Sequence, residues 1–178
     1  MIILITGGSR SGKSVYAERL LKEHDDTVYI ATAEITDDEM QARVAAHIAR
    51  RNSKWRTYEQ YRNLKNAVGC EKFYLLDCVT NLISRTLFDL TKSAQSVTAR
   101  DMQNVIDASM RELRSLIDAV KKINGTLIIV TNEVGSSIVP MESVSRCFSD
   151  AQGIVNAELA KVADRVFLTV CGIPIRIK

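Results

Sequence analysis

The chain has 178 residues, of which 46% are hydrophobic, 25% charged and 6% aromatic, and its formal net charge is +3. This length suits one domain with its own core, and eight glycines and two prolines exclude collagen-like and Pro-rich disordered classes. The small charge gives no indication of nucleic-acid binding, and no apolar run approaches the ~20 residues of a transmembrane helix. We therefore expect a single domain over residues 1–178 without membrane insertion. Because Met1–Ile5 lacks the features of a signal peptide, we expect the protein in the cytoplasm.

Short β-rich runs alternate with longer helical patterns along the chain. The runs are continuous rather than alternating, which is typical of a parallel sheet covered on both faces. The predicted strands are Ile2–Thr6, Thr27–Thr32, Phe73–Asp77, Thr126–Thr131 and Arg165–Val170, and the predicted helices cover about 13–24, 37–52, 79–90, 98–122 and 142–163. This order predicts an α/β fold with a mostly parallel central sheet flanked by helices.

The end of the chain follows a different pattern. Cys171-Gly172 separates two apolar runs by two residues, which predicts a β-hairpin. The last strand, Ile173–Ile177, would then run antiparallel at an edge of the sheet, where Pro174 is tolerated.

The first predicted strand leads into a phosphate-binding loop. Gly7-Gly8-Ser9-Arg10-Ser11-Gly12-Lys13-Ser14 fits G-x-x-x-x-G-K-[ST] and stands between a predicted strand and a predicted helix. Glycines let the backbone wrap around phosphates, and the N–H groups and helix N-terminus then face the anion. In this motif Lys13 reaches the β- and γ-phosphates and the Ser14 hydroxyl ligates Mg²⁺. The alternative is a plain glycine-rich turn. Chance matches to this motif are rare, and they are rarer still between a strand and a helix.

Asp77 closes the predicted strand Phe73–Asp77. A carboxylate at the carboxyl end of a buried strand is suited to hold Mg²⁺ directly or through water. The alternative is an aspartate that caps the following helix. A switch GTPase is excluded, because Cys78-Val79-Thr80 follows Asp77 in place of D-x-x-G, and the chain has no N-K-x-D sequence.

The segment after the second strand carries a histidine among basic residues. Thr36-Asp37-Asp38-Glu39 predicts a capping box that starts a helix. One stripe of this helix, flanked by Arg43 and Arg50, combines Met40, Val44, His47 and Arg51. Such a basic stripe suits a phosphate-rich ligand, and nearby cations favour neutral imidazole, which could attack an α-phosphate. The spacing alone also allows a half-buried structural histidine.

The remaining histidine and the cysteines do not form a metal-binding pattern. His24 lies among charged residues, and we expect it to be solvated. No two cysteines stand in a C-x-x-C pair, and we expect reduced, mostly buried thiols at Cys70, Cys78, Cys147 and Cys171. A zinc site of His and Cys is therefore not expected.

Several segments spread from end to end are shared with one known family. They are Ile5–Ser14, Tyr29–Ala33, Asp38-Glu39-Met40 with Arg43 and His47, Trp55-Arg56-Thr57, Leu76-Asp77-Cys78, Thr131–Gly135 with Ile138-Val139-Pro140, and Ile175–Lys178. On these segments the chain resembles the bifunctional adenosylcobinamide kinase / adenosylcobinamide-phosphate guanylyltransferase family of cobalamin biosynthesis. It departs from the usual family residues at Arg85, Ser137, Ser149 and Ala157.

The resemblance implies a RecA-like P-loop fold, a homotrimer, and a histidine at position 47 that carries GMP covalently. It also implies that a guanosine nucleotide lies along the phosphate loop and against Ala31, Thr32, Ala33, Ile48, Ala49, Arg50, Arg51, Glu59 and Asp77. The bulky corrinoid substrate of this family would need an open cleft, which we expect between subunits.

The implied chemistry has two parts. ATP or GTP first phosphorylates the aminopropanol hydroxyl of adenosylcobinamide, with Lys13 at the phosphates and Mg²⁺ held by Ser14 and Asp77. His47 then attacks the α-phosphate of GTP and releases pyrophosphate, and the GMP passes to adenosylcobinamide phosphate, which gives adenosylcobinamide-GDP. Two alternatives remain: a guanylyltransferase without the kinase step, and a non-catalytic nucleotide-binding regulator.

Overall fold

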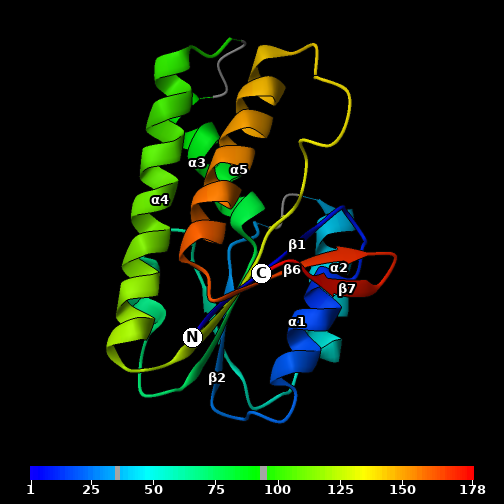
Figure 1. Ribbon diagram of the computed structural model, residues 1–178, viewed down its shortest axis with the longest axis vertical. Coiled ribbons are helices and arrows are strands. Elements are labelled where there is room, and N and C mark those ends of the chain that lie inside the picture. Colours follow the sequence, from blue (N-terminus) through cyan, green and yellow to red (C-terminus); the bar gives the residue numbers. More distant parts are fainter. Residues whose placement is uncertain (35–36, 93–95) are drawn as a thin grey trace.

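The computed structural model describes residues 1–34, 37–92 and 96–178, apart from the side chains of Glu39, Met40 and Arg43. Its elements, in chain order (Figure 1), are β1 (Ile2–Gly7), α1 (Lys13–Leu21), β2 (Thr27–Ala31), α2 (Asp38–Arg50), β3 (Arg56–Glu59), the 3-10 helix η1 (Leu64–Ala67), β4 (Phe73–Asp77), α3 (Val79–Thr91), α4 (Ala99–Lys122), β5 (Thr126–Val130), α5 (Ser143–Val162), β6 (Arg165–Val170) and β7 (Ile173–Arg176). Every predicted helix and strand is present, with ends that differ by up to three residues. Thr36 of the expected capping box lies outside the described residues, as do the side chains of Met40 and Arg43.

The strands form one seven-stranded sheet in the order β3-β2-β4-β5-β1-β6-β7. All neighbours are parallel except β6 and β7, which pair antiparallel. Cys171 and Gly172 in the turn between them have φ values of 50° and 81°, which suits a tight two-residue hairpin. The predicted α/β class and the antiparallel edge hairpin are confirmed.

The edge strand β3 and the 3-10 helix η1 are not predicted from the sequence. β3 consists of the four residues Arg-Thr-Tyr-Glu and pairs only with β2. Only Tyr58 is partly buried, so the strand has no apolar run. An edge strand with this composition is formed by main-chain pairing with β2, which hydrophobic patterning does not reveal.

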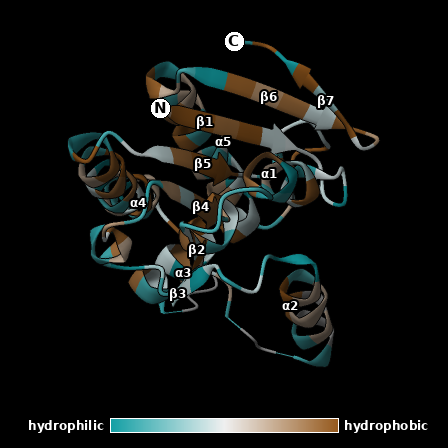
Figure 2. Cartoon of the chain, turned by 90° about the horizontal axis from the view of Figure 1, so that it is seen from below, coloured by the Kyte–Doolittle hydropathy of each residue, from teal (hydrophilic) through white to brown (hydrophobic). Residues whose placement is uncertain are grey.

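The two faces of the sheet bury two separate apolar clusters. Ile2 and Leu4 of β1 pack in the cluster that includes α3, α4 and α5, whereas Ile3 and Ile5 pack in the cluster that includes α1. Figure 2 shows α4 and α1 on opposite sides of the sheet. The alternation along β1 therefore explains why its run is apolar throughout.

The helix that carries His47 is placed differently from the others. Figure 2 shows α2 standing apart from the sheet, and none of its described side chains is buried. In its last turn, His47 and Arg50 meet Glu18 of α1. Polar contacts rather than a shared core hold this end of α2 against the domain.

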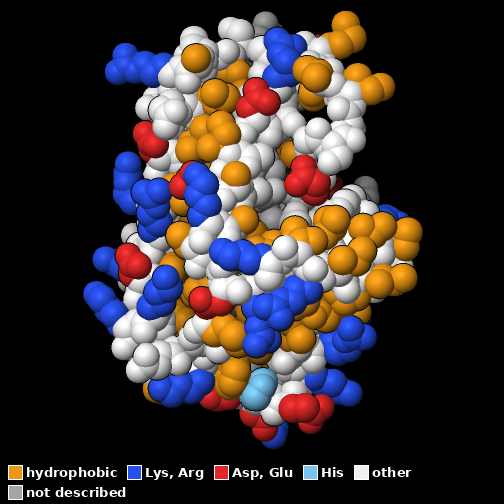
Figure 3. Space-filling view, viewed as in Figure 1, with side chains coloured by type: hydrophobic (Ala, Val, Ile, Leu, Met, Phe, Trp, Pro, Cys, Tyr) orange, Lys and Arg blue, Asp and Glu red, His pale blue; other side chains and the backbone are white. Residues whose placement is uncertain are grey.

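The surface in Figure 3 mixes both signs of charge over α4, while hydrophobic side chains gather over the β6–β7 hairpin. The exposed apolar residues there are Val170, Ile173, Ile175 and Ile177. In the described part of the chain no helix is long and apolar enough to cross a membrane.

Two side-chain expectations need correction. All four cysteines are free, but only Cys78 and Cys147 are buried, whereas Cys70 and Cys171 are exposed. His24 is half-buried rather than fully solvated, because its ring stacks on Phe73 with centroids 3.8 Å apart.

Candidate active site

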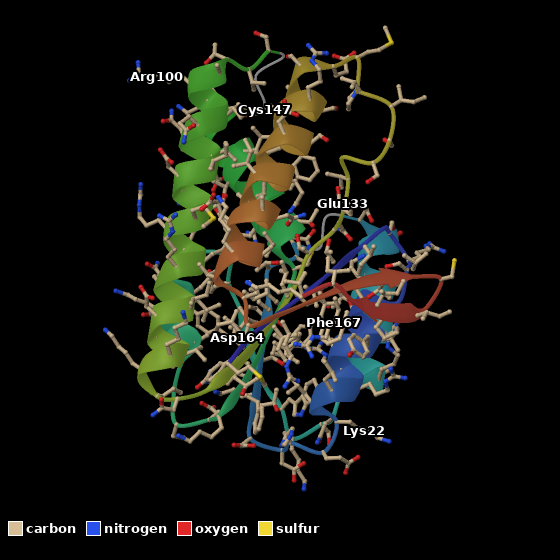
Figure 4. The ribbon with its side chains drawn as sticks, viewed as in Figure 1. Lys22, Arg100, Glu133, Cys147, Asp164 and Phe167 are labelled. Atoms are coloured by element: carbon tan, nitrogen blue, oxygen red, sulfur yellow. The ribbon has the colours of Figure 1, made fainter. Side chains whose placement is uncertain are left out.

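The phosphate loop joins β1 to α1 and is fastened to two neighbouring segments. The N–H of Glu133 donates to the Gly7 carbonyl over 2.9 Å, and the N–H of Gly172 donates to the Ser11 carbonyl over 2.9 Å. Figure 4 shows Glu133 where the segment after β5 leaves the sheet. Gly12, at φ 97°, directly precedes α1, so the first N–H groups of the helix end at this loop. The predicted strand–loop–helix context of the motif is confirmed.

Lys13 crosses this loop. Its Nζ donates to the Gly8 carbonyl over 2.6 Å, and the residue is only 7% exposed. Burial lowers the pKa of the Lys13 ammonium, although Cys78 and Asp77 nearby oppose that shift. The Ser11 hydroxyl is buried and has no hydrogen-bond partner within the described residues. The loop thus presents a cation and an unpaired hydroxyl close together, which suits a phosphate.

The carboxyl ends of three neighbouring strands bring further expected residues into line. Ala31 is in register with Asp77 on one side and with Glu59 on the other. Thr32 is fully buried, donates to the Cys78 carbonyl over 2.6 Å, and accepts the Cys78 N–H over 2.9 Å. This edge is where parallel α/β sheets bind ligands.

Asp77 does not cap the following helix. The residue before α3 is Cys78, and its helix has no side-chain cap. Instead the Tyr29 hydroxyl donates to Asp77 Oδ2 over 3.0 Å, and the Asp77 side chain is 10% exposed. Burial raises the pKa of Tyr29, and the negative charge of Asp77 raises it further, so the phenol keeps its proton. Burial also raises the pKa of Cys78 to about 12, which leaves an inert thiol beside the site.

His47 faces acids as well as a base. Its Nδ1 lies 3.4 Å from Glu18 Oε1, 3.8 Å from Asp77 Oδ2 and 3.4 Å from a terminal nitrogen of Arg50. The basic residues expected from the sequence are therefore only part of the surroundings, because two carboxylates lie beside His47 as well. The structure nevertheless places this histidine beside the strand-end carboxylate, with its side chain 31% exposed.

A cavity of about 430 Å³ that is open to solvent begins at Ile48, the residue after His47. The Arg51 guanidinium lies 3.9 Å from the centre of the Tyr29 ring, and its Nε donates to the His47 carbonyl over 3.3 Å. The cavity is lined by Ile48, Ala49, Arg51, Asn52, Ser53, Trp55, Thr57 and Glu59. Four of these, Ile48, Ala49, Arg51 and Glu59, are residues that the family resemblance implied.

The residues expected to hold Mg²⁺ fit a Mg²⁺ ion by their chemistry. Ser14 supplies a hydroxyl in the first turn of α1, and Asp77 supplies a carboxylate at the end of β4. Oxygen donors in small number suit Mg²⁺, which keeps water and substrate phosphates as its other ligands. Among the side chains that the structure describes, which exclude Glu39, there is no group of three His, Cys, Asp or Glu that could bind a metal by themselves.

Two side chains of the site, Glu18 and Tyr29, were given no role from the sequence. Glu18 is 8% exposed and shares a face of α1 with the buried Ala17 and Leu21. A charged residue on the apolar face of a helix is the signal that could have indicated it. Tyr29 gave no comparable signal, because an aromatic residue in an apolar strand is ordinary.

Comparison with known proteins gives the family of the chain. A family model described as cobinamide kinase / cobinamide phosphate guanyltransferase matches residues 3–177. The chain is 40% identical over 184 residues to the bifunctional adenosylcobalamin biosynthesis protein CobU of Escherichia coli (strain K12), with full coverage of both. It is 35% identical over 180 residues to the bifunctional adenosylcobalamin biosynthesis protein CobP of Pseudomonas aeruginosa, covering 98% of this chain and 96% of that protein.

Among solved structures, the chain is similar to a prototypical ATPase from the type III secretion system of pathogenic bacteria. The TM-score is 0.59 at 14% identity, over 94% of this chain and 50% of the ATPase. This likeness concerns the fold, and it supports the P-loop class that the sequence predicts. With the match over nearly its whole length, the chain belongs to the cobinamide kinase / cobinamide phosphate guanyltransferase family.

Proposed function

We propose that this chain performs both reactions of its family at one P-loop site, with His47 as the guanylyl carrier. It would phosphorylate adenosylcobinamide with ATP or GTP and then transfer GMP from GTP to adenosylcobinamide phosphate. The observation that carries the proposal is the 3.8 Å separation between His47 Nδ1 and Asp77 Oδ2. A nucleophile this close to the strand-end carboxylate lies within reach of a nucleotide on the phosphate loop.

In the kinase step the phosphate loop supplies positioning and charge. The loop amides and Lys13 would bind the β- and γ-phosphates, and Ser14 and Asp77 would hold Mg²⁺, which neutralises phosphate charge when bound. The acceptor hydroxyl attacks the γ-phosphorus, and the bond to the β-phosphate oxygen breaks. Preorganised donors of this kind stabilise the charge that develops in transfer.

In the guanylyl step His47 acts as the nucleophile. An imidazole nitrogen forms a bond to the α-phosphorus of GTP, and the bond to pyrophosphate breaks. A phosphate oxygen of adenosylcobinamide phosphate then displaces the imidazole and forms adenosylcobinamide-GDP. Covalent catalysis replaces one difficult transfer by two easier ones.

The cavity beside His47 supports a purine base as its occupant. Trp55 and the Ile48–Ala49 segment give apolar and aromatic lining, and Glu59 adds a carboxylate to the lining. We infer that this carboxylate accepts hydrogen bonds from the N1–H and the amino group of guanine. Adenine has no N1–H, so this contact would favour GTP in the guanylyl step.

We also infer that the protein acts in the cytoplasm as a homotrimer. The relatives, which are named as biosynthesis proteins, support the first part. Exposed isoleucines along the edge strand β7 support contact with another subunit.

Incubation with Mg²⁺ and GTP labelled at the α-phosphate, followed by denaturing electrophoresis, tests the proposal. The label should stay on the denatured chain, be lost in acid and survive in base, as a phosphoramidate does. His47→Ala should take no label. His24→Ala is the matched control and should label normally, because His24 stacks on Phe73. Label that persists in His47→Ala, or that maps to a lysine, would contradict the mechanism.

A second assay separates the alternatives. Transfer of the γ-phosphate to unphosphorylated adenosylcobinamide distinguishes the bifunctional enzyme from one with guanylyltransferase activity alone. GTP binding without either transfer would indicate a regulator.

A further inference from the structure

Glu18 contacts His47 and takes no part in the two transfer steps. Glu18 Oε1 lies 3.4 Å from His47 Nδ1, against 3.8 Å for Asp77 Oδ2. Glu18 is 8% exposed and lies on α1, the helix that begins at the phosphate loop. A buried carboxylate against a histidine nitrogen is the arrangement that fixes the orientation and tautomer of an imidazole.

The other groups near Nδ1 are already engaged elsewhere. Asp77 Oδ2 accepts the Tyr29 hydroxyl over 3.0 Å. Arg50 directs its Nε to Glu18 Oε2 over 3.3 Å and a terminal nitrogen to Oε1 over 3.4 Å. Although that same terminal nitrogen lies 3.4 Å from Nδ1, a guanidinium bonds a carboxylate more strongly than a neutral ring nitrogen. Glu18 is therefore the group that determines whether the ring proton of the neutral imidazole lies on Nδ1.

The opposite ring nitrogen, Nε2, has no such partner among the described side chains. Among the side chains that the structure describes, which do not include Glu39, Met40 and Arg43, the hydrogen bonds and ion pairs of the His47 side chain all involve Nδ1. Nδ1 is enclosed by Glu18, Asp77 and Arg50, which leaves Nε2 as the nitrogen that can approach a phosphorus atom.

We propose that Glu18 is a positioning residue that accepts the Nδ1–H of His47, so that GMP becomes attached at Nε2. The proposal rests on His47 being the guanylyl carrier. It adds which nitrogen reacts and which residue makes that nitrogen available.

The atoms balance in both directions. The Nε2 lone pair forms the N–P bond while the bond to pyrophosphate breaks, and the Nδ1 proton stays between the ring and Glu18. The ring becomes cationic as the bond forms, and the adjacent carboxylate stabilises that charge. When the acceptor phosphate displaces the imidazole, the electron pair returns to Nε2 and the same Nδ1–H remains.

The ionisation of Glu18 agrees with this geometry. Burial by itself would raise the pKa of the Glu18 carboxyl, but hydrogen bonds from His47 and Arg50 outweigh burial and lower it. The carboxyl group is therefore an anion near neutral pH and can only accept a hydrogen bond.

The first test compares single-turnover guanylylation rates in the full-length enzyme with Mg²⁺ and GTP. Glu18→Gln should slow labelling of the chain by about 10- to 100-fold, the loss typical when the partner of a functional histidine is changed. The GTP concentration for half-maximal rate should stay the same, because in this proposal Glu18 contacts His47 and not the nucleotide. Glu18→Asp should recover part of the rate, since it keeps the charge. Glu23→Gln, at an exposed position just after α1, is the matched control and should label at the wild-type rate.

The second test identifies the nitrogen. Phosphorus NMR of the guanylylated enzyme, prepared with ¹⁵N-labelled histidine, distinguishes attachment at Nε2 from attachment at Nδ1. The wild type should carry GMP at Nε2, and the residual label in Glu18→Gln should divide between both nitrogens. A purely structural role of Glu18 would slow labelling without changing the nitrogen.

The possible outcomes separate this proposal from the function on which it rests. Attachment at Nδ1 in the wild type, or a wild-type rate in Glu18→Gln, would overturn the role of Glu18 while leaving His47 as carrier. Label retained in His47→Ala would instead overturn the carrier assignment.

Discussion

Lys13 is an ammonium group held in a largely buried position at the phosphate loop. It donates to the Gly8 carbonyl over 2.6 Å, and Asp77 lies close enough to favour its charged form. A buried cation without a counter-ion would be costly, so the neighbouring carbonyl and carboxylate let the chain keep it in place. The charge is thereby fixed before the nucleotide arrives.

Lys13→Ala should reduce both γ-phosphate transfer and guanylylation by roughly 10²- to 10³-fold, because one preorganised cation is lost. Labelled GTP, at the α-position for one reaction and the γ-position for the other, measures both. Lys22→Ala is the control, since Lys22 is exposed and lies at the far end of α1 (Figure 4). Near-normal rates in Lys13→Ala would refute the assignment of the phosphate loop.

Gly7 and Gly8 stand side by side but differ in what surrounds them. Gly7 has a φ of 149°, and a Cβ there would lie 2.4 Å from the Thr169 carbonyl oxygen of β6. A Cβ on Gly8 would meet nothing within 4 Å. Gly7→Ala should therefore destabilise the fold by about 1–3 kcal/mol, a shift of several degrees in the thermal midpoint, whereas Gly8→Ala should unfold near the wild-type temperature. Equal midpoints for the two variants, measured by circular dichroism, would contradict this.

Among the elements, α4 and α2 are held by different means. Eight buried side chains anchor α4 in the core, and a capping box of Thr98 and Asp101 closes its first turn. The described side chains of α2 are exposed or half-buried, and its last turn is held by Glu18. An element held by polar contacts is free to place a nucleophile without disturbing the core, because little apolar area changes when it moves.

Removing the cap of α4 should have a defined cost. The Thr98 hydroxyl accepts the N–H of Asp101 over 3.2 Å and satisfies a helix N–H that would otherwise lack a partner. Thr98→Ala should lower the free energy of unfolding by about 1 kcal/mol, whereas Thr98→Ser keeps the hydroxyl and should lose much less. Urea denaturation monitored by circular dichroism measures the difference, and equal losses would show that the hydroxyl is not the cause.

At the scale of the whole molecule, one sheet is shared by two apolar clusters. Leu76 belongs to the cluster with α3, α4 and α5, and Leu75 to the cluster with α1, and both are fully buried. The central strands β1, β2, β4 and β5 therefore depend on both faces, so the clusters cannot unfold one after the other without exposing the sheet between them. We therefore expect one cooperative domain over residues 1–178.

Leu75→Ala and Leu76→Ala should each destabilise the protein by about 2–5 kcal/mol. In both variants far-UV circular dichroism and the fluorescence of Trp55, the single tryptophan, should report one transition with the same midpoint. Trp55 is buried in the cluster with α1, so an earlier fluorescence change in Leu75→Ala alone would indicate two independent units.

The sequence by itself determined the order of the main elements and the phosphate loop, because apolar runs, glycine spacing and Lys13-Ser14 are local features. It also indicated Asp77 and His47 as reactive groups. It did not reveal β3, whose polar residues pair through the main chain at an edge.

Only the tertiary structure decided what surrounds these groups. The basic residues near His47 in the sequence predicted a basic site, yet Glu18 and Asp77, 29 and 30 residues away along the chain, contribute carboxylates to it. Their approach depends on how α1, α2 and the end of β4 meet, and no local pattern encodes that. The strand order of the sheet fixes this meeting, because parallel strands place their carboxyl ends at one edge.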